Sequence, residues 1–375
     1  MKTDPRMLRR SGRGFSAGAS MQCVVVTGNG DTELVAHLLS QVLNAQSHTR
    51  ARVVMVGKGE TPESMLAGLA RERCTHALLR VEQNDLLRTE WGDLCPSLCV
   101  LTGTPGAGES VELARRSRHV VYSPDEPGWQ RVWTQPHPGA FTYAQQDMRA
   151  NLTARNLRMF PSHVEFEAVS TGRIQRIFLP VAGGFSFYHG LCVLACGLCL
   201  GLDWEEMGRA LRSARGPVGR MEVLPISAAC SVVLDRAETV AEVERLLTCA
   251  REFTAARLIC LLSCPSRADG WTLAQLGGVA EQLADEVILT GDGIASDAAM
   301  AVMGQVQQGM TGVVSQLPDR DEAIDRALQE AGAGDVIVLA GTHVGERPAA
   351  FARERARIMA YFTGARTREN SCRGR

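Results

Sequence analysis

The stretch from Val24 to Leu39 (VVVTGNGDTELVAHLL) has the residue types and spacing of a phosphate-binding turn. A buried strand, a glycine-rich turn and a helix start follow one another, and backbone N–H groups at such a helix N-terminus can wrap a phosphate. Gly28, Gly30 and the hydroxyl of Thr32 are in place, but Asp31 stands where a lysine would complete the motif. A carboxylate about 4 Å from a triphosphate repels it by on the order of 1 kcal/mol per charge pair even in water. The sequence therefore predicts the frame of a nucleotide site without its main cation.

Three cysteines share one face of a predicted apolar helix between Leu179 and Leu202. Cys192, Cys196 and Cys199 are spaced at i, i+4 and i+7. Three thiolates could hold a metal ion, but no fourth ligand is apparent in the sequence except a distant histidine. Small thiols also suit tight helix packing, and this second interpretation is favoured.

The elements that must position these residues alternate between strands and helices. Short apolar runs expected to be buried strands include 53–56, 77–81, 98–101 and 120–122, and helical patterns lie between them. This order predicts a parallel sheet with helices on both faces. Residues 141–179 instead alternate in polarity and predict an antiparallel hairpin around Thr171 and Gly172. Further alternation from residue 204 to residue 341 predicts a second open α/β sheet, followed by a helix over 347–362.

The length of 375 residues suggests two domains, each with its own core. We expect a basic disordered lead over 1–20, a central domain over 21–218, a second domain over 219–365 and a disordered tail over 366–375. The net charge of −1 gives no reason to expect nucleic acid or membrane partners. No apolar run reaches spanning length, and no apolar segment follows the basic lead as a secretory signal would require. The 12 cysteines fit free thiols in a reducing cytoplasm.

With these pieces placed, the chain resembles the Mur ligase family, above all its MurE-type members, from about Val24 to Phe362. The segments that carry the resemblance are GPVGRMEV at 216–223, LADEVILTGD at 283–292, DRDEAIDRAL at 319–328 and GDVIVLAG at 334–341, with TPES at 61–64, SPDEPGWQRV at 123–132 and PVAGGFSFYHGL at 180–191. The resemblance implies a P-loop-type central sheet domain followed by a Rossmann-like C-terminal domain. It also implies ATP-dependent ligation with magnesium, although the family's first, uridine-nucleotide-binding domain has no counterpart in this sequence.

Some functional positions of the family are kept in this sequence. The resemblance places the family's magnesium glutamate at Glu82, its phosphate-reaching arginine at Arg220 and a strand-end aspartate at Asp235. The same three residues could equally serve structure, as a capped turn, a junction ion pair and a strand-end carboxylate. The start of the amino-acid-recognition motif is kept as Asp292.

Other functional positions of the family carry a different residue type in this sequence. The phosphate-loop lysine falls at Asp31, and two asparagines near the nucleotide fall at Ser186 and His189. The substrate-binding arginine falls at Ala295, and the closing lysine-and-glutamate segment becomes GTHVG at 341–345. The chain has only two lysines, at positions 2 and 58, so the family's metal-bridging lysine is missing too. Phosphoryl transfer depends on positioning and on neutralising phosphate charge, so this loss argues for the fold and against the activity.

Three functions are consistent with this pattern. The first is a MurE-like pseudoenzyme without a cofactor, which binds a protein partner or itself in the cytoplasm and is linked to peptidoglycan precursor synthesis. The second is a divergent amide ligase that uses ATP and magnesium on a different acid and amine. The third is a carrier of another small ligand. In the first, the residues of the vestigial nucleotide site are Gly28, Gly30, Asp31, Thr32, Arg220 and Asp235, with Glu82 for the metal and Asp292 for the substrate.

Overall fold

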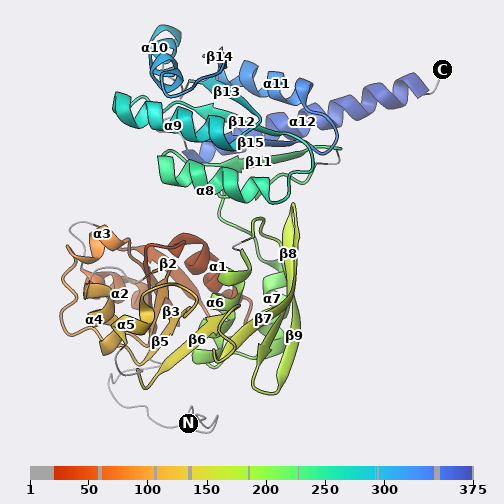
Figure 1. Cartoon of the computed structure of the whole chain (residues 1–375). Helices are drawn as coiled ribbons and strands as arrows, with labels where there is room; N and C mark the ends of the chain where they lie inside the picture. The colour runs from red at the N-terminus through yellow and green to blue at the C-terminus, as the bar shows by residue number, and fades with distance from the viewer. Residues whose placement is uncertain are drawn as a thin grey trace. The chain divides into compact units, whose positions relative to one another are not determined.

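The computed structural model describes residues 21–57, 61–104, 108–133, 137–184, 186–226, 228–291, 293, 295–341 and 347–373. These residues form two compact units (Figure 1). The first contains the described residues up to Arg158, together with Val164–Pro180 and 186–215. The second contains Met159–His163, Val181–Gly184 and the described residues from Gly216 onward. The change between units at Gly216 lies close to the expected domain boundary.

The first unit is built on a nine-stranded sheet with the order β2-β3-β1-β4-β5-β6-β7-β8-β9. Its strands are β1 (Gln22–Gly28), β2 (Ala51–Met55), β3 (His76–Arg80), β4 (Leu98–Thr102), β5 (His119–Tyr122), β6 (Ala140–Ala144), β7 (Leu152–Phe160), β8 (His163–Ser170) and β9 (Arg173–Leu179). The pairs from β2 to β7 in that order are parallel. Strands β8 and β9 form the predicted antiparallel hairpin, in which Ser170 pairs with Arg173 and Gly172 has a positive φ of 73°.

Most helices of the first unit pack on the parallel strands of this sheet, whereas the last one packs on β9 of the hairpin. They are α1 (Thr32–Asn44), α2 (Pro62–Arg71), α3 (Gln83–Leu86), α4 (Gly108–Arg116), α5 (Trp129–Val132), α6 (Ser186–Cys199) and α7 (Trp204–Ser213). Helix α6, the apolar helix, packs against α1, α7 and strands β4–β6. Its length of 14 residues is too short to span a membrane, and the described part of the chain contains no helix that is both long and apolar enough to do so.

Strand β2 corrects one expectation, because the run 53–56 is not a buried strand. β2 lies at the edge of the sheet and pairs with β3. Val53 and Met55 are therefore 39% and 58% exposed, and only Val56, just after the strand, is fully buried. An apolar run alone cannot distinguish a central strand from an edge strand, since the difference depends on the order of strands in the sheet.

The second unit holds a six-stranded sheet with the order β10-β11-β15-β12-β13-β14. Its strands are β10 (Glu222–Val223), β11 (Ser231–Asp235), β12 (Leu258–Ser263), β13 (Glu286–Thr290), β14 (Ser315–Leu317) and β15 (Val336–Ala340). All neighbours are parallel except β10 and β11. The unit is therefore the open, mostly parallel α/β sheet that the sequence predicts.

Helices pack on both faces of this second sheet. Helices α8 (Val240–Arg251), α9 (Gly270–Leu283) and α10 (Ser296–Gln307) share one core with alternate strand residues such as Val233 and Cys260. Helices α11 (Arg320–Glu330) and α12 (Arg347–Arg373) share the other core with residues such as Val232 and Ile259. Because α12 continues to Arg373, the tail expected to be disordered from residue 366 lies within a helix up to that point. The segment ARTRENSCR contains no proline or glycine to stop a helix.

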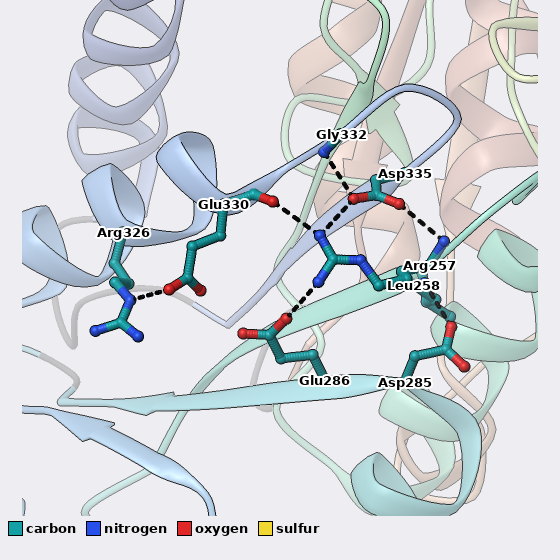
Figure 2. A network of polar contacts seen from close by, with 8 residues as sticks. All are labelled: Arg257, Leu258, Asp285, Glu286, Arg326, Glu330, Gly332 and Asp335. Carbon is teal, nitrogen blue, oxygen red and sulfur yellow. Dashed lines mark hydrogen bonds and ion pairs between the residues drawn. The ribbon is translucent and has the colours of Figure 1, made fainter.

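A network of charged groups holds the amino ends of the central strands together (Figure 2). The guanidinium of Arg257, just before β12, donates to the carboxylate of Asp335 at 2.8 Å and to Glu286 Oε2 at 3.2 Å. Asp335, just before β15, also accepts from the Arg257 N–H at 2.9 Å and the Gly332 N–H at 2.8 Å. Ligands bind at the carboxyl ends of strands in open α/β sheets, so this network at the opposite edge is structural.

Candidate functional site

The carboxyl ends of β1, β3 and β4 meet at the glycine-rich turn between β1 and α1. Val26 of β1 is in register with Arg80 of β3, and Gly28 is in register with Thr102 of β4. This edge of a parallel sheet is where the fold class places ligands. The structure therefore places Gly28, Gly30, Asp31 and Thr32 at this edge of the sheet.

The two glycines of this turn are packed against the end of β4. Gly28 has a φ of +130°, and a Cβ at this position would overlap the carbonyl oxygen of Thr102. A Cβ on Gly30 would lie 2.9 Å from the backbone nitrogen of Gly103. The N–H of Gly30 donates to the Thr102 carbonyl at 3.3 Å. Both glycines are therefore required by the contact between two backbones, whether or not a phosphate ever binds there.

Asp31 is the N-cap of α1. Its Oδ1 accepts a hydrogen bond from the Leu34 N–H at 3.0 Å. The Thr32 N–H donates to the Gly30 carbonyl at 2.9 Å, so three N–H groups around this turn, those of Gly30, Thr32 and Leu34, have acceptors within the protein. The first N–H groups of a helix have no partner within the helix, and a bound anion can accept from them. Here the carboxylate of Asp31 accepts from one of them, the N–H of Leu34.

A cation does lie at this turn, and it comes from β3. Arg80, at the carboxyl end of that strand, donates through Nε to Thr32 Oγ1 at 3.3 Å and through Nη2 to Glu82 Oε1 at 2.9 Å. Its Nη1 lies 3.8 Å from Glu33 Oε1. The Arg80 side chain is 19% exposed, whereas the Glu82 side chain is 57% exposed. The Glu82 side chain makes no capping hydrogen bond to the short helix α3 that follows it, and it pairs with Arg80 instead.

Most of the charged side chains that the structure describes at this turn are negative. Asp31, Glu33 and Glu82 supply three carboxylates, and Arg80 supplies one guanidinium. Asp31 caps α1 and Glu33 lies in its first turn, so both are at the helix end where the dipole stabilises negative charge. A polyphosphate placed here would meet net repulsion unless other cations accompanied it.

Asp235 and Arg220 belong to the second unit. Asp235 ends β11, is 5% exposed and accepts from the Met221 N–H at 2.7 Å and the Ala237 N–H at 2.9 Å. Burial raises the pKa of Asp235 to about 6, although the two N–H groups and the positive charge of Arg220 act in the opposite direction. The charge of Arg220 also helps to lower the pKa of Glu242, whose own burial raises it. Within this unit the carboxylate of Asp235 holds the backbone at Met221 and at Ala237.

The remaining predicted positions are partly outside the described residues. Asp292 lies outside them, as does His343. Ser186 begins α6 and is buried, and His189 lies in the first turn of the same helix.

The three cysteines on α6 are in apolar surroundings. Cys192 and Cys196 are fully buried, and burial raises the pKa of the Cys199 thiol to about 12. Among the described residues no group of three or more histidines, cysteines or acids is placed to hold a metal ion.

Arg80 is the residue that the sequence analysis missed. The signal was present, because residues 80 and 82 are two apart at the end of a strand and such residues point to the same side. The link from β3 back to Thr32, 48 residues earlier, depends on the strand order and is visible only in the structure.

Comparison with known proteins identifies the second unit most directly. The sequence profile of the "Mur ligase, glutamate ligase domain" matches residues 219–343. A UDP-N-acetylmuramoyl-L-alanyl-D-glutamate–2,6-diaminopimelate ligase of Pseudomonas aeruginosa is 33% identical over 202 residues, which span 53% of this chain and 42% of that enzyme. The ligase of the same name from Synechocystis is 27% identical over 357 residues, 86% of this chain and 71% of the relative. The aligned part of this chain thus spans less than half of the Pseudomonas relative.

Solved structures extend the likeness to the whole fold. A structure of UDP-N-acetylmuramoyl-L-alanyl-D-glutamate–2,6-diaminopimelate ligase matches with a TM-score of 0.64 and 21% identity, over 86% of this chain and 73% of that chain. Folylpolyglutamate synthase of Mycobacterium tuberculosis, solved in complex with ADP, matches with a TM-score of 0.63 and 15% identity, over 86% and 88% of the two chains. At these identities the likeness concerns the fold.

Proposed function

We propose that this chain, which belongs to the Mur ligase family, is a catalytically silent member that binds a protein partner or itself and is linked to peptidoglycan precursor synthesis. The observation that carries the proposal is the capping of α1 by Asp31. Its carboxylate accepts from the Leu34 N–H at 3.0 Å, at the helix end that would have to receive a phosphate. In this proposal the family's nucleotide turn has become a structural turn.

Two further features support the absence of catalysis. The residues at the turn do not fit a magnesium-bound triphosphate, because Thr32 and Glu82 already bond to Arg80 and the turn presents three carboxylates. Asp235 accepts hydrogen bonds from two N–H groups of the second unit, a structural role that does not need a nucleotide. The positive charge of Arg220 acts on Asp235 and Glu242 of the same unit. Transfer of a phosphoryl group needs cations around it, and their loss would cost several orders of magnitude in rate.

Nucleotide binding and turnover by the full chain test the catalytic half of the proposal. Calorimetric titration with Mg-ATP should give no saturable heat, and phosphate release should not exceed that of buffer. ATP consumption that falls in Arg220→Ala but persists in the exposed control Arg209→Ala would overturn the proposal. That result would instead favour a divergent ATP-dependent amide ligase, which the retained Glu82, Arg220 and Asp235 support.

The binding half of the proposal needs its own test. Light scattering at several protein concentrations should reveal either a stable oligomer or co-elution with a purified MurE-type ligase, with a change in that ligase's rate. A chain that stays monomeric, elutes alone and leaves the ligase rate unchanged would contradict a scaffolding or regulatory role.

A further inference from the structure

We propose that Arg80 is a built-in cation that stands in for a divalent metal ion at the turn between β1 and α1. This inference rests on the proposed function and deepens it, because it names what keeps the site closed. Three nitrogens of one guanidinium reach oxygens of Thr32, Glu82 and Glu33, at 3.3, 2.9 and 3.8 Å respectively.

The oxygens that surround Arg80 are of the kind that hard divalent cations bind. Mg²⁺ and Mn²⁺ take carboxylate, hydroxyl and water oxygens, and a P-loop hydroxyl together with a carboxylate from a neighbouring strand is a common set. Here the hydroxyl of Thr32 opens α1, and the carboxylate of Glu82 follows β3. The guanidinium bonds to the Thr32 hydroxyl and to Oε1 of Glu82, so a metal ion that bound these two oxygens together would have to take the place of the guanidinium.

The positive charge of Arg80 strongly disfavours a divalent ion at these oxygens. The guanidinium cannot lose its proton in a protein, and the Arg80 side chain is only 19% exposed. A divalent ion among the same oxygens would lie a few ångströms from a permanent positive charge in a partly desolvated place. At an effective dielectric constant of about 20 this repulsion exceeds the roughly 1.4 kcal/mol that corresponds to tenfold in affinity.

Removal of the guanidinium should therefore reverse the preference of the site. Without Arg80, the carboxylates of Glu33 and Glu82 and the Thr32 hydroxyl lose the guanidinium that they share. We expect this arrangement to destabilise the turn and to attract a divalent ion. No covalent bond of the chain is broken or formed, because the metal ion only binds oxygens that the guanidinium contacts in the wild type.

Thermal unfolding of the full chain with and without Mn²⁺ tests the inference. In Arg80→Met, Mn²⁺ should raise the unfolding temperature in a saturable way, since a ligand that binds only the folded state stabilises it. The wild type should bind Mn²⁺ at least about tenfold more weakly than the variant. Arg52→Met is the matched control, because it removes an arginine from the neighbouring strand β2, where it pairs with Glu72 in an exposed ion pair. This control should not gain a response to Mn²⁺.

Two results would overturn the inference. Mn²⁺ could fail to stabilise Arg80→Met, or it could stabilise the double variant Arg80→Met/Glu82→Gln to the same extent. If Arg80→Met does not fold, electron paramagnetic resonance of Mn²⁺ with the wild type tests the inference instead. One tightly bound Mn²⁺ ion in the wild type that is absent from Glu82→Gln would show that Arg80 does not exclude a metal ion from these oxygens. ATP turnover by the wild type would contradict the proposed function, whatever the result of these metal titrations.

Discussion

Arg320 and Glu354 form an ion pair inside the second unit, with Arg320 Nε 2.6 Å from Glu354 Oε1. Their side chains are 1% and 4% exposed. Arg320 begins α11, and its Nη2 also donates to the carbonyl of Gly341 at 2.8 Å. Glu354 lies on α12, so one buried pair joins the two helices on this face of the sheet to the end of β15.

Breaking this pair should destabilise the second unit strongly. Glu354→Gln leaves a buried guanidinium without its counter-charge, which costs about 3–5 kcal/mol of unfolding free energy. Urea unfolding measures the loss. The control is Arg326→Ala, which removes the exposed pair with Glu330 one turn along on the same helix and should cost less than about 1 kcal/mol. Equal losses in the two variants would mean that the buried pair is not the link described here.

Asp31 should contribute to stability through its hydrogen bond rather than its charge. Asp31→Ala removes the acceptor of the Leu34 N–H and should cost about 1 kcal/mol, whereas Asp31→Asn keeps an acceptor and should change stability by only a few tenths of a kcal/mol. Chemical unfolding of the two variants distinguishes these effects. A larger loss in Asp31→Asn than in Asp31→Ala would show that the charge, not the cap, is what the turn requires.

Much of the fold could be predicted because alternation and capping are local. The hairpin at Gly172, helix α7 and the buried strands β11, β12 and β15 follow directly from their residue patterns. The burial of Val53 could not be predicted in this way, because it depends on β2 being the edge strand of the sheet.

The candidate site also has features that the sequence predicts and features that only the structure shows. Asp31 is recognisable in the sequence as a charge of the wrong sign, but its role as N-cap depends on the backbone conformation of the turn. Arg80 could be paired with Glu82 from their spacing, whereas its contact with Thr32 needs two strands to lie side by side. The sequence therefore shows that the lysine of the phosphate loop is absent, and only the structure shows which hydrogen bonds Asp31 and Arg80 make at the turn.

Asp235 should make stability depend on pH in an unusual direction. Its pKa in the folded protein is about 6, raised mainly by burial from an ordinary value of 3.8, so the folded state binds the proton more tightly than the unfolded state. The stabilising contribution is fully present below about pH 4 and is lost as the pH rises through about 6, a change of about 3 kcal/mol. Urea unfolding between pH 4 and pH 7 should show this fall in the wild type relative to Asp235→Asn.

Asp335 provides the control of opposite sign. Burial raises its pKa, but the Gly332 N–H and Arg257 more than offset this effect, so its pKa is lowered. A lowered pKa gives stability that is present above the unfolded value and lost as the pH falls. The difference between the wild type and Asp335→Asn should therefore grow with pH, whereas the difference for Asp235→Asn should shrink. Parallel trends in the two variants would contradict the assignment of Asp235.

Gly28 should be indispensable to the fold even if no phosphate ever binds. Gly28→Ala places a Cβ against the Thr102 carbonyl at a φ of +130°, which L side chains rarely adopt, and should cost about 2 kcal/mol or more. Gly68→Ala is the matched control, since it lies within α2 with no atom within 4 Å of its added Cβ and should be neutral or stabilising by up to about 1 kcal/mol. Urea unfolding measures both variants. A Gly28→Ala protein as stable as wild type would mean that this glycine is not held by the β4 backbone, and it would return a ligand to consideration as the reason for its presence.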